Sequence, residues 1–137
     1  MRVMGLDYGK KTIGVAVSDL LKMTAQGKEV IKRTSKKKDM KRLKELVENN
    51  KVEKIVVGLP INMNGTKGPR AEKTLKFVDR LERHFSIPIE TWDERLSTME
   101  AERTLIQGDV SRKKRKKVID KMAAVIILQG YLDRHYR

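Results

Sequence analysis

The sequence contains no cysteine and only two histidines. The lack of cysteine excludes disulfide bonds, thiolate zinc sites and a cysteine nucleophile. His84 and His135 stand beside charged or terminal residues, and we expect both at the surface. Neither lies in a context that supports a Ser-His-Asp triad. Any catalytic chemistry is therefore expected to depend on carboxylates and cations.

Long hydrophobic runs are also missing. The longest covers residues 122–128 (MAAVIIL), against about 20 residues needed to span a bilayer. Asp7 interrupts the first apolar segment, so no signal-peptide core is present. We therefore expect a soluble, cytoplasmic protein with no membrane partner. The length of 137 residues predicts a single domain over residues 1–137 that builds its core without metals or disulfides.

Acidic residues are the minority among the charged ones. The chain has 32 Lys and Arg against 18 Asp and Glu, which gives a net charge of +14. This excess predicts a polyanionic partner, with nucleic acid the first choice and an acidic membrane surface the weaker one. Aromatic residues make up 4% of the chain, so phosphate and shape contacts are expected to matter more than base stacking.

Two basic clusters carry much of this charge. One covers residues 32–44, and the other is an unbroken run of six cations before the last helix. A charge run is often no more than a solvated face, but this run stands close to a candidate acidic site, where it would help a phosphate backbone to approach. Its members, all candidate nucleic-acid contacts, are Arg112, Lys113, Lys114, Arg115, Lys116 and Lys117.

Hydrophobic periodicity predicts a mixed α/β order. Short β-branched segments at 2–7 and 12–18 flank a YGKK turn, which predicts a hairpin, and 25–33 predicts a third, more exposed strand. Further strands are expected at 53–59 and 87–92, and helices at 36–50, 71–85, 96–107 and 115–134. The helix at 71–85 should bury Leu75, Val78 and Leu81. Helices 36–50 and 71–85 are expected to act as crossovers between parallel strands.

Acidic residues stand at two predicted strand ends. Asp7 ends an apolar strand at the edge where open α/β sheets bind ligands, although it could instead satisfy local amides in a turn. Asp93 and Glu94 lie where a strand ends and a helix begins. Because neighbouring strand side chains point to opposite faces, only one of them should face Asp7. The alternative is a helix N-terminal acid paired with Arg95.

A third acid, Asp120, lies inside a helix that is apolar nearly all round. An acid in such a place is unfavourable unless it is paired or binds a metal. Ala123 and Ala124 would let this helix approach the sheet closely, and the alternative role for Asp120 is a salt bridge with Lys116. Converging carboxylates can hold Mg²⁺ or Mn²⁺, ions that promote phosphodiester hydrolysis.

A loop rich in Asn and Gly, residues 58–70, follows a buried strand and opens a helix. Its amides and cations suit an anionic ligand at a helix N-terminus, although an ordinary connector is the alternative. The loop lacks the Gly-Lys-Ser/Thr of a Walker A loop. The candidate nucleic-acid contacts outside the basic run are Lys11, Asn62, Asn64, Lys67, Arg70 and Arg95.

Four segments together resemble the YqgF family, ribonuclease H-like proteins described as Holliday junction resolvases or pre-16S rRNA nucleases. They are GLDYG (5–9) with IGVAVSD (13–19), VGLP (57–60) with NGT (64–66), DERLST (93–98), and DKMAA (120–124) with ILQGYL (127–132). Each is weak alone, but four in order along almost the whole chain are specific. Ser97 stands where the family often has Thr, and serine keeps the hydroxyl group at this position.

The resemblance implies a ribonuclease H-like α/β fold: a five-stranded mixed sheet, with three antiparallel strands first, flanked by helices. It also implies a catalytic metal site at Asp7, Asp93, Glu94 and Asp120 that uses Mg²⁺ or Mn²⁺ to cut phosphodiester bonds. The strand at 55–60 carries no acid, whereas better-known resolvases of this fold place a carboxylate there. The Asp93-Glu94 pair must then supply the missing ligand.

Three functions stay open at this point. The first is a metal-dependent endonuclease on structured RNA or branched DNA, with the 5′ end of pre-16S rRNA favoured over DNA junctions. Junction resolution needs a dimer, no dimerisation patch is evident, and we expect a monomer or weak homodimer. The second is a non-catalytic RNA-binding factor in ribosome maturation. The third is an actin-like ATPase or sugar kinase, because Asp7, Gly9 and Gly14 resemble the first phosphate loop of those enzymes, which need two such domains.

Overall fold

A five-stranded mixed sheet forms the centre of the computed structural model, which describes residues 1–62, 64–94 and 112–136, and the backbone alone at 112–121. The strands are β1 (Arg2–Tyr8), β2 (Thr12–Ser18), β3 (Ala25–Lys32), β4 (Val52–Leu59) and β5 (Ile89–Asp93), in the order β3-β2-β1-β4-β5. The first three pair antiparallel, and β4 and β5 continue the sheet parallel to β1. The predicted ribonuclease H-like fold is confirmed.

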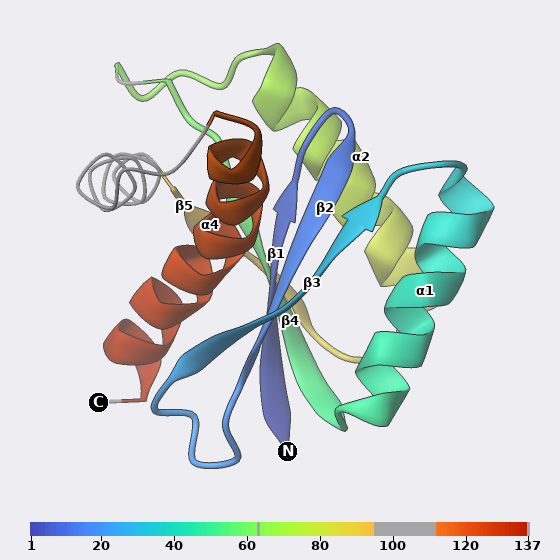
Figure 1. The fold of residues 1–137 in the computed structure, drawn as a ribbon, viewed down its shortest axis with the longest axis vertical. Coiled ribbons are helices and arrows are strands. Elements are labelled where there is room, and N and C mark those ends of the chain that lie inside the picture. The colour runs from blue at the N-terminus through green and yellow to red at the C-terminus, as the bar shows by residue number, and fades with distance from the viewer. Residues whose placement is uncertain (63, 95–111, 137) are drawn as a thin grey trace.

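Helices cover both faces of this sheet (Figure 1). α1 (Lys36–Asn49) and α2 (Pro69–His84) lie on one face, and α4 (Arg112–His135) crosses the other. Alternate strand residues supply the two cores because strand side chains point to opposite faces in turn. Leu6 and Val57 pack with α1 and α2, whereas Val3 and Val56 pack with α4.

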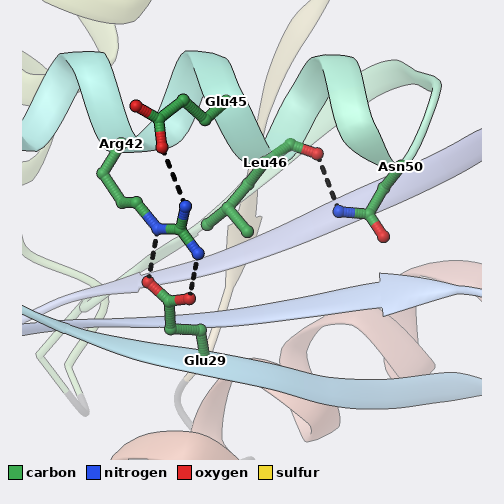
Figure 2. A network of polar contacts seen from close by, with 5 residues as sticks. All are labelled: Glu29, Arg42, Glu45, Leu46 and Asn50. Atoms are coloured by element: carbon green, nitrogen blue, oxygen red, sulfur yellow. Dashed lines mark hydrogen bonds and ion pairs between the residues drawn. The ribbon is translucent and has the colours of Figure 1, made fainter.

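α1 is the predicted crossover from β3 to β4, and its ends carry the capping groups that fix it. The Ser35 side chain accepts a hydrogen bond from the backbone N–H of Lys38, and Asn50 closes the helix with its side chain on the Leu46 carbonyl. Figure 2 shows Arg42 donating to both carboxylate oxygens of Glu29 on β3 and to Glu45. This part of the basic cluster at 32–44 therefore ties α1 to the edge strand.

The boundaries of α2 and β5 differ from those predicted. α2 begins at Pro69, since a proline fits the first turn of a helix. Within α2, the predicted core residue Leu75 is only half-buried, whereas Phe77 is buried. β5 begins at Ile89, because Pro88 has no N–H for the ladder; its carbonyl instead accepts from the N–H of Ile55. In both cases proline sets the first residue of the element.

The last helix begins earlier than predicted. α4 starts at Arg112, so the whole basic run lies within the helix, whereas the predicted start at residue 115 included only its second half. Lys and Arg are good helix formers, which lets the helix extend through six cations. The predicted helix at 96–107 lies outside the described residues. Over the part of the chain that the structure describes, no helix has both the length and the hydropathy that crossing a bilayer requires.

Candidate active site

Asp7 lies at the carboxyl end of β1, on the face of the sheet that α4 covers. Val3 belongs to the core beneath α4, and alternation places Gly5 and Asp7 on the same face. Leu6 and Tyr8 point to the opposite face, where α1 and α2 pack. Asp7 is half-buried and pairs with Gly14 across the hairpin. Asp7 thus lies at the strand end predicted from the sequence, and its role in ligand binding stays a prediction.

The helix approaches β1 very closely just before Asp7. A Cβ on Gly5 would stand 2.7 Å from Leu128 Cβ and 3.1 Å from the Ala124 carbonyl oxygen. Ala123 and Ala124 are both buried, as expected for small residues at a close helix–sheet contact. Glycine on the strand and alanine on the helix therefore let the backbone of α4 lie directly over β1.

Glu94, rather than Asp93, turns to the face of Asp7. Asp93 is the last residue of β5 and pairs with Leu59, whereas Trp92 packs into the core beneath α4. The Glu94 side chain points to the same face of the sheet as Trp92, two residues earlier. The backbone nitrogen of Glu94 lies 3.3 Å from the Leu59 carbonyl oxygen. Its carboxylate oxygen Oε2 fills the space over Gly58 on β4, where a Cβ would overlap it.

Gly58 therefore has a role that the sequence did not reveal. A Cβ at this position would meet Glu94 Oε2 and the Ile127 side chain of α4 at overlapping distances. The strand that carries no acid of its own thus leaves room for a carboxylate that arrives from the next strand. The sequence shows that the strand at 55–60 has no acid. Only the pairing of β4 with β5 shows that Glu94 fills the space over Gly58.

The pKa of Glu94 reflects its burial and the nearby Asp7 carboxylate. Burial, then the Asp7 carboxylate and, to a smaller extent, Asp93 together raise the pKa of Glu94 to about 7. Arg70, in the first turn of α2, acts in the opposite direction. Two half-buried carboxylates that repel each other form a centre that a cation would stabilise.

The raised pKa predicts a pH-dependent stability. Glu94 holds its proton to about pH 7 in the folded chain but only to about 4.5 when unfolded, so stability falls as pH rises between these values. Glu94→Gln should therefore stabilise the protein in EDTA at pH 8, on the order of 2 kcal/mol, and have little effect at pH 5. Urea unfolding at both pH values measures this. Exposed Glu82→Gln is the control, and equal effects of Glu94→Gln at the two pH values would contradict the assignment.

The backbone of Asp120 lies in α4, one helical turn before Ala124. Ala124 contacts β1 at Gly5, and Gln129, later in the helix, accepts from the N–H of Ala25 at the end of the sheet away from Asp7. The residues before Ala124 therefore extend toward the end of β1 that carries Asp7. Among the described side chains no group of three His, Asp or Glu forms a metal centre. The side chains of Asp120 and of the run 112–117 are not among those described, and Arg95 lies outside the described residues.

The Asn/Gly loop before α2 is held by its own side chains. The backbone N–H and side-chain amide of Asn62 donate to the carbonyl and hydroxyl oxygens of Thr66. The N–H and hydroxyl of Thr66 in turn donate to the side-chain oxygen of Asn64. Gly65 between them adopts a left-handed φ of 85°. Lys67 and Arg70 are exposed. The asparagine amides thus build the loop, and Lys67 and Arg70 are among the side chains it presents to solvent.

The sheet order, the helix on each face and the acidic pair at the edge define a ribonuclease H-like protein. Solved structures share this fold. One is Thermus thermophilus RuvC in complex with a Holliday junction substrate (TM-score 0.58, 14% identity, covering 99% of this chain and 96% of that one). The fowlpox virus Holliday junction resolvase is similar (TM-score 0.57, 15% identity, 98% and 99%).

Sequence comparison gives the family. The family model described as "RuvX: Holliday junction resolvase" matches residues 1–134, and the chain belongs to this family, which is the YqgF family named above. Relatives called "Putative pre-16S rRNA nuclease" are 62% identical: one from Desulforamulus reducens (97% of each chain) and one from Clostridioides difficile (96% of this chain, 94% of that one). The chain is thus placed among nucleases, hydrolases that act on ester bonds, rather than among kinases.

Proposed function

We propose that this protein is a divalent-metal-dependent endonuclease that processes the 5′ end of pre-16S rRNA in the cytoplasm, through a single domain over residues 1–137. Relatives about 60% identical over nearly the whole chain carry the name "Putative pre-16S rRNA nuclease". The observation that carries the proposal is the Glu94 carboxylate over Gly58, on the same face as Asp7. It supplies an acid where the strand itself has none.

The residues present fit Mg²⁺ or Mn²⁺. Both ions prefer oxygen ligands, and the neighbouring carboxylates of Asp7 and Glu94 offer such oxygens at one edge of the sheet. Asp120, next along α4 toward this edge, is the third proposed ligand, and the exposed Asp93 is the weaker candidate. Divalent ions in such sites stabilise charge on phosphate oxygens and lower the pKa of water.

The cationic residues have a separate task in this proposal. Arg70 offsets the negative charge of Glu94 and can hold a phosphate close to the carboxylates. Lys11 and Lys67 are exposed cations on the adjoining loops, and both are proposed contacts to the phosphate backbone. The run 112–117 and Arg95 are proposed to add backbone contacts, whereas Asn62 and Asn64 would contribute through the loop they shape.

A second substrate deserves a direct test. The family description and the fold of two junction resolvases favour branched DNA as the alternative. A monomer or weak homodimer fits RNA processing more readily, because symmetric junction cutting needs two sites. The non-catalytic alternative rested on the missing acid on β4, and the Glu94 carboxylate over Gly58 weakens that support.

Cleavage by wild type and Asp7→Asn, each with Mn²⁺ and with EDTA, tests the proposal. The substrates are a structured RNA with the pre-16S 5′ leader and a four-way DNA junction. We expect RNA cutting that needs Mn²⁺ and falls at least about a thousandfold in Asp7→Asn, as expected for loss of a metal-ligand charge. Preferential junction cutting would move the assignment to a resolvase. Binding without cutting would establish the non-catalytic factor.

A further inference from the structure

A second feature lies on the opposite face of the sheet from the carboxylates. The β1–β2 turn, the segment before α1 and the exposed side of α2 enclose a groove of about 770 Å³. In Figure 1 the β1–β2 turn lies beside α2 at the end of the sheet where β1 terminates. Nine cationic side chains line the groove against one acid, Asp79, which already pairs with Arg83 at 2.8 Å. Such a concave surface concentrates positive potential.

The cations on α2 form a helical stripe. Arg70, Lys73, Lys76, Arg80 and Arg83 recur at intervals of three and four residues, which places them along one side of the helix next to its buried stripe. From Arg70 to Arg83 the stripe spans about 20 Å of helix, comparable to the axial rise of about six base pairs of duplex. Its length therefore suits a backbone rather than a single anion.

Two of the lining arginines already contact other residues of the protein, whereas several lining lysines can bind a ligand. Tyr8 stacks on Phe77 with ring centroids 4.1 Å apart, and its hydroxyl accepts from Arg80 at 3.0 Å. Arg33 lies 4.4 Å over the Tyr8 ring and donates to the Gly9 and Lys10 carbonyls. By contrast, none of the interactions found within the described ranges engages the ammonium groups of the lining lysines Lys36, Lys73 and Lys76.

The groove adjoins the carboxylate site through two links. Tyr8 follows Asp7 directly on β1, so neighbouring residues serve the two faces. Arg70 begins the basic stripe and also acts on the charge of Glu94. A strand bound with one phosphate near the carboxylates can thus continue past Arg70 into the groove.

We propose that this groove binds the phosphate backbone of the substrate beside the cleavage point, through Lys36, Lys73, Lys76 and their neighbours. The inference rests on the proposed nuclease function for its choice of substrate. The stripe makes backbone contacts, so it positions the nucleic acid without reading base sequence. It extends the contact surface beyond the loops and the run 112–117.

Salt-dependent binding tests the groove without any cleavage. The paired variant Lys73→Gln/Lys76→Gln is compared with Lys41→Gln/Lys44→Gln, which removes the same charge from exposed positions on α1 outside the groove. Dissociation constants for the leader RNA and for the four-way DNA junction are measured in EDTA over a range of salt. We expect the groove variant to bind roughly tenfold more weakly, with a salt slope reduced by about 1.4 to 1.8, and the control to stay near wild type.

The outcomes separate this inference from the proposed function. Equal slopes for the two paired variants would overturn the groove, even if wild type cuts RNA in a metal-dependent way. A lower slope in the groove variant supports the groove even if no cleavage is found, in which case the nuclease proposal alone fails. Loss of affinity for only one of the two nucleic acids identifies which backbone the groove holds.

Discussion

Glu94→Gln should lower the rate of RNA cleavage at least about a thousandfold, equal to about 4 kcal/mol of transition-state stabilisation, while Asp93→Asn stays within about fivefold of wild type. The two substitutions make the same chemical change at adjacent residues. Their effects on cleavage should differ because the two side chains point to different places. The Glu94 side chain lies over Gly58 on the face that carries Asp7, whereas Asp93 is exposed at the end of β5. Only the first removes a carboxylate from the proposed metal site.

Single-turnover cleavage of the leader RNA in Mn²⁺ measures this difference, with binding in EDTA as the parallel reading. Binding should be unchanged or tighter in both variants, since each removes a negative charge from a surface that meets phosphates. Glu94→Gln is expected to be more stable than wild type at pH 8 in EDTA, so its loss of cleavage would not come from unfolding of the variant. A larger loss in Asp93→Asn than in Glu94→Gln would reverse the assignment of the ligand.

Gly58→Ala should lower cleavage by about a hundredfold or more and destabilise the fold by about 1 to 3 kcal/mol. The added methyl group would overlap both Glu94 Oε2 and the Ile127 Cδ1 methyl, so the carboxylate must leave its place over β4. Cleavage assays and urea unfolding measure the two effects separately.

Two further variants separate the loss of the site from the loss of packing. Gly58→Ala/Ile127→Val removes the overlapping methyl of Ile127 and should recover stability but not cleavage. Gly130→Ala makes the same change in α4, where the nearest neighbour is Trp92 Nε1 at 3.3 Å and alanine favours the helix, so activity should persist. Full cleavage by Gly58→Ala would show that the carboxylate position over β4 is not needed.

Local sequence pattern predicted the sheet and the first two helices because each has strong periodicity and clear end signals. The hairpin around YGKK and the stop at Asn50 follow from residues close in sequence. Proline moved the start of α2 and β5, which a hydrophobic pattern alone does not register. The burial of Phe77 in place of Leu75 depends on how α2 rotates against the sheet, a tertiary choice.

The candidate site was predictable in its members and less so in its geometry. Sequence indicated that only one of Asp93 and Glu94 could face Asp7, but the choice depends on which face Trp92 packs against. The basic stripe on α2 had a readable signal in the spacing from Arg70 to Arg83. These cations are separated in sequence, so they form a stripe only once α2 is helical, unlike the compact basic clusters at 32–44 and 112–117.

The alternation of side chains along β1 has a consequence for substrate shape. Asp7 and Tyr8 are consecutive, yet one faces α4 and the other faces α2. A nucleic acid that reaches the carboxylates and also enters the basic groove has to turn around the rim of the sheet at the β1–β2 turn. A straight, continuous duplex cannot follow such a path, whereas a bend, a single-stranded flank or a branch can. Selection for non-linear substrates would then arise from the pleat of one strand, with no base being read.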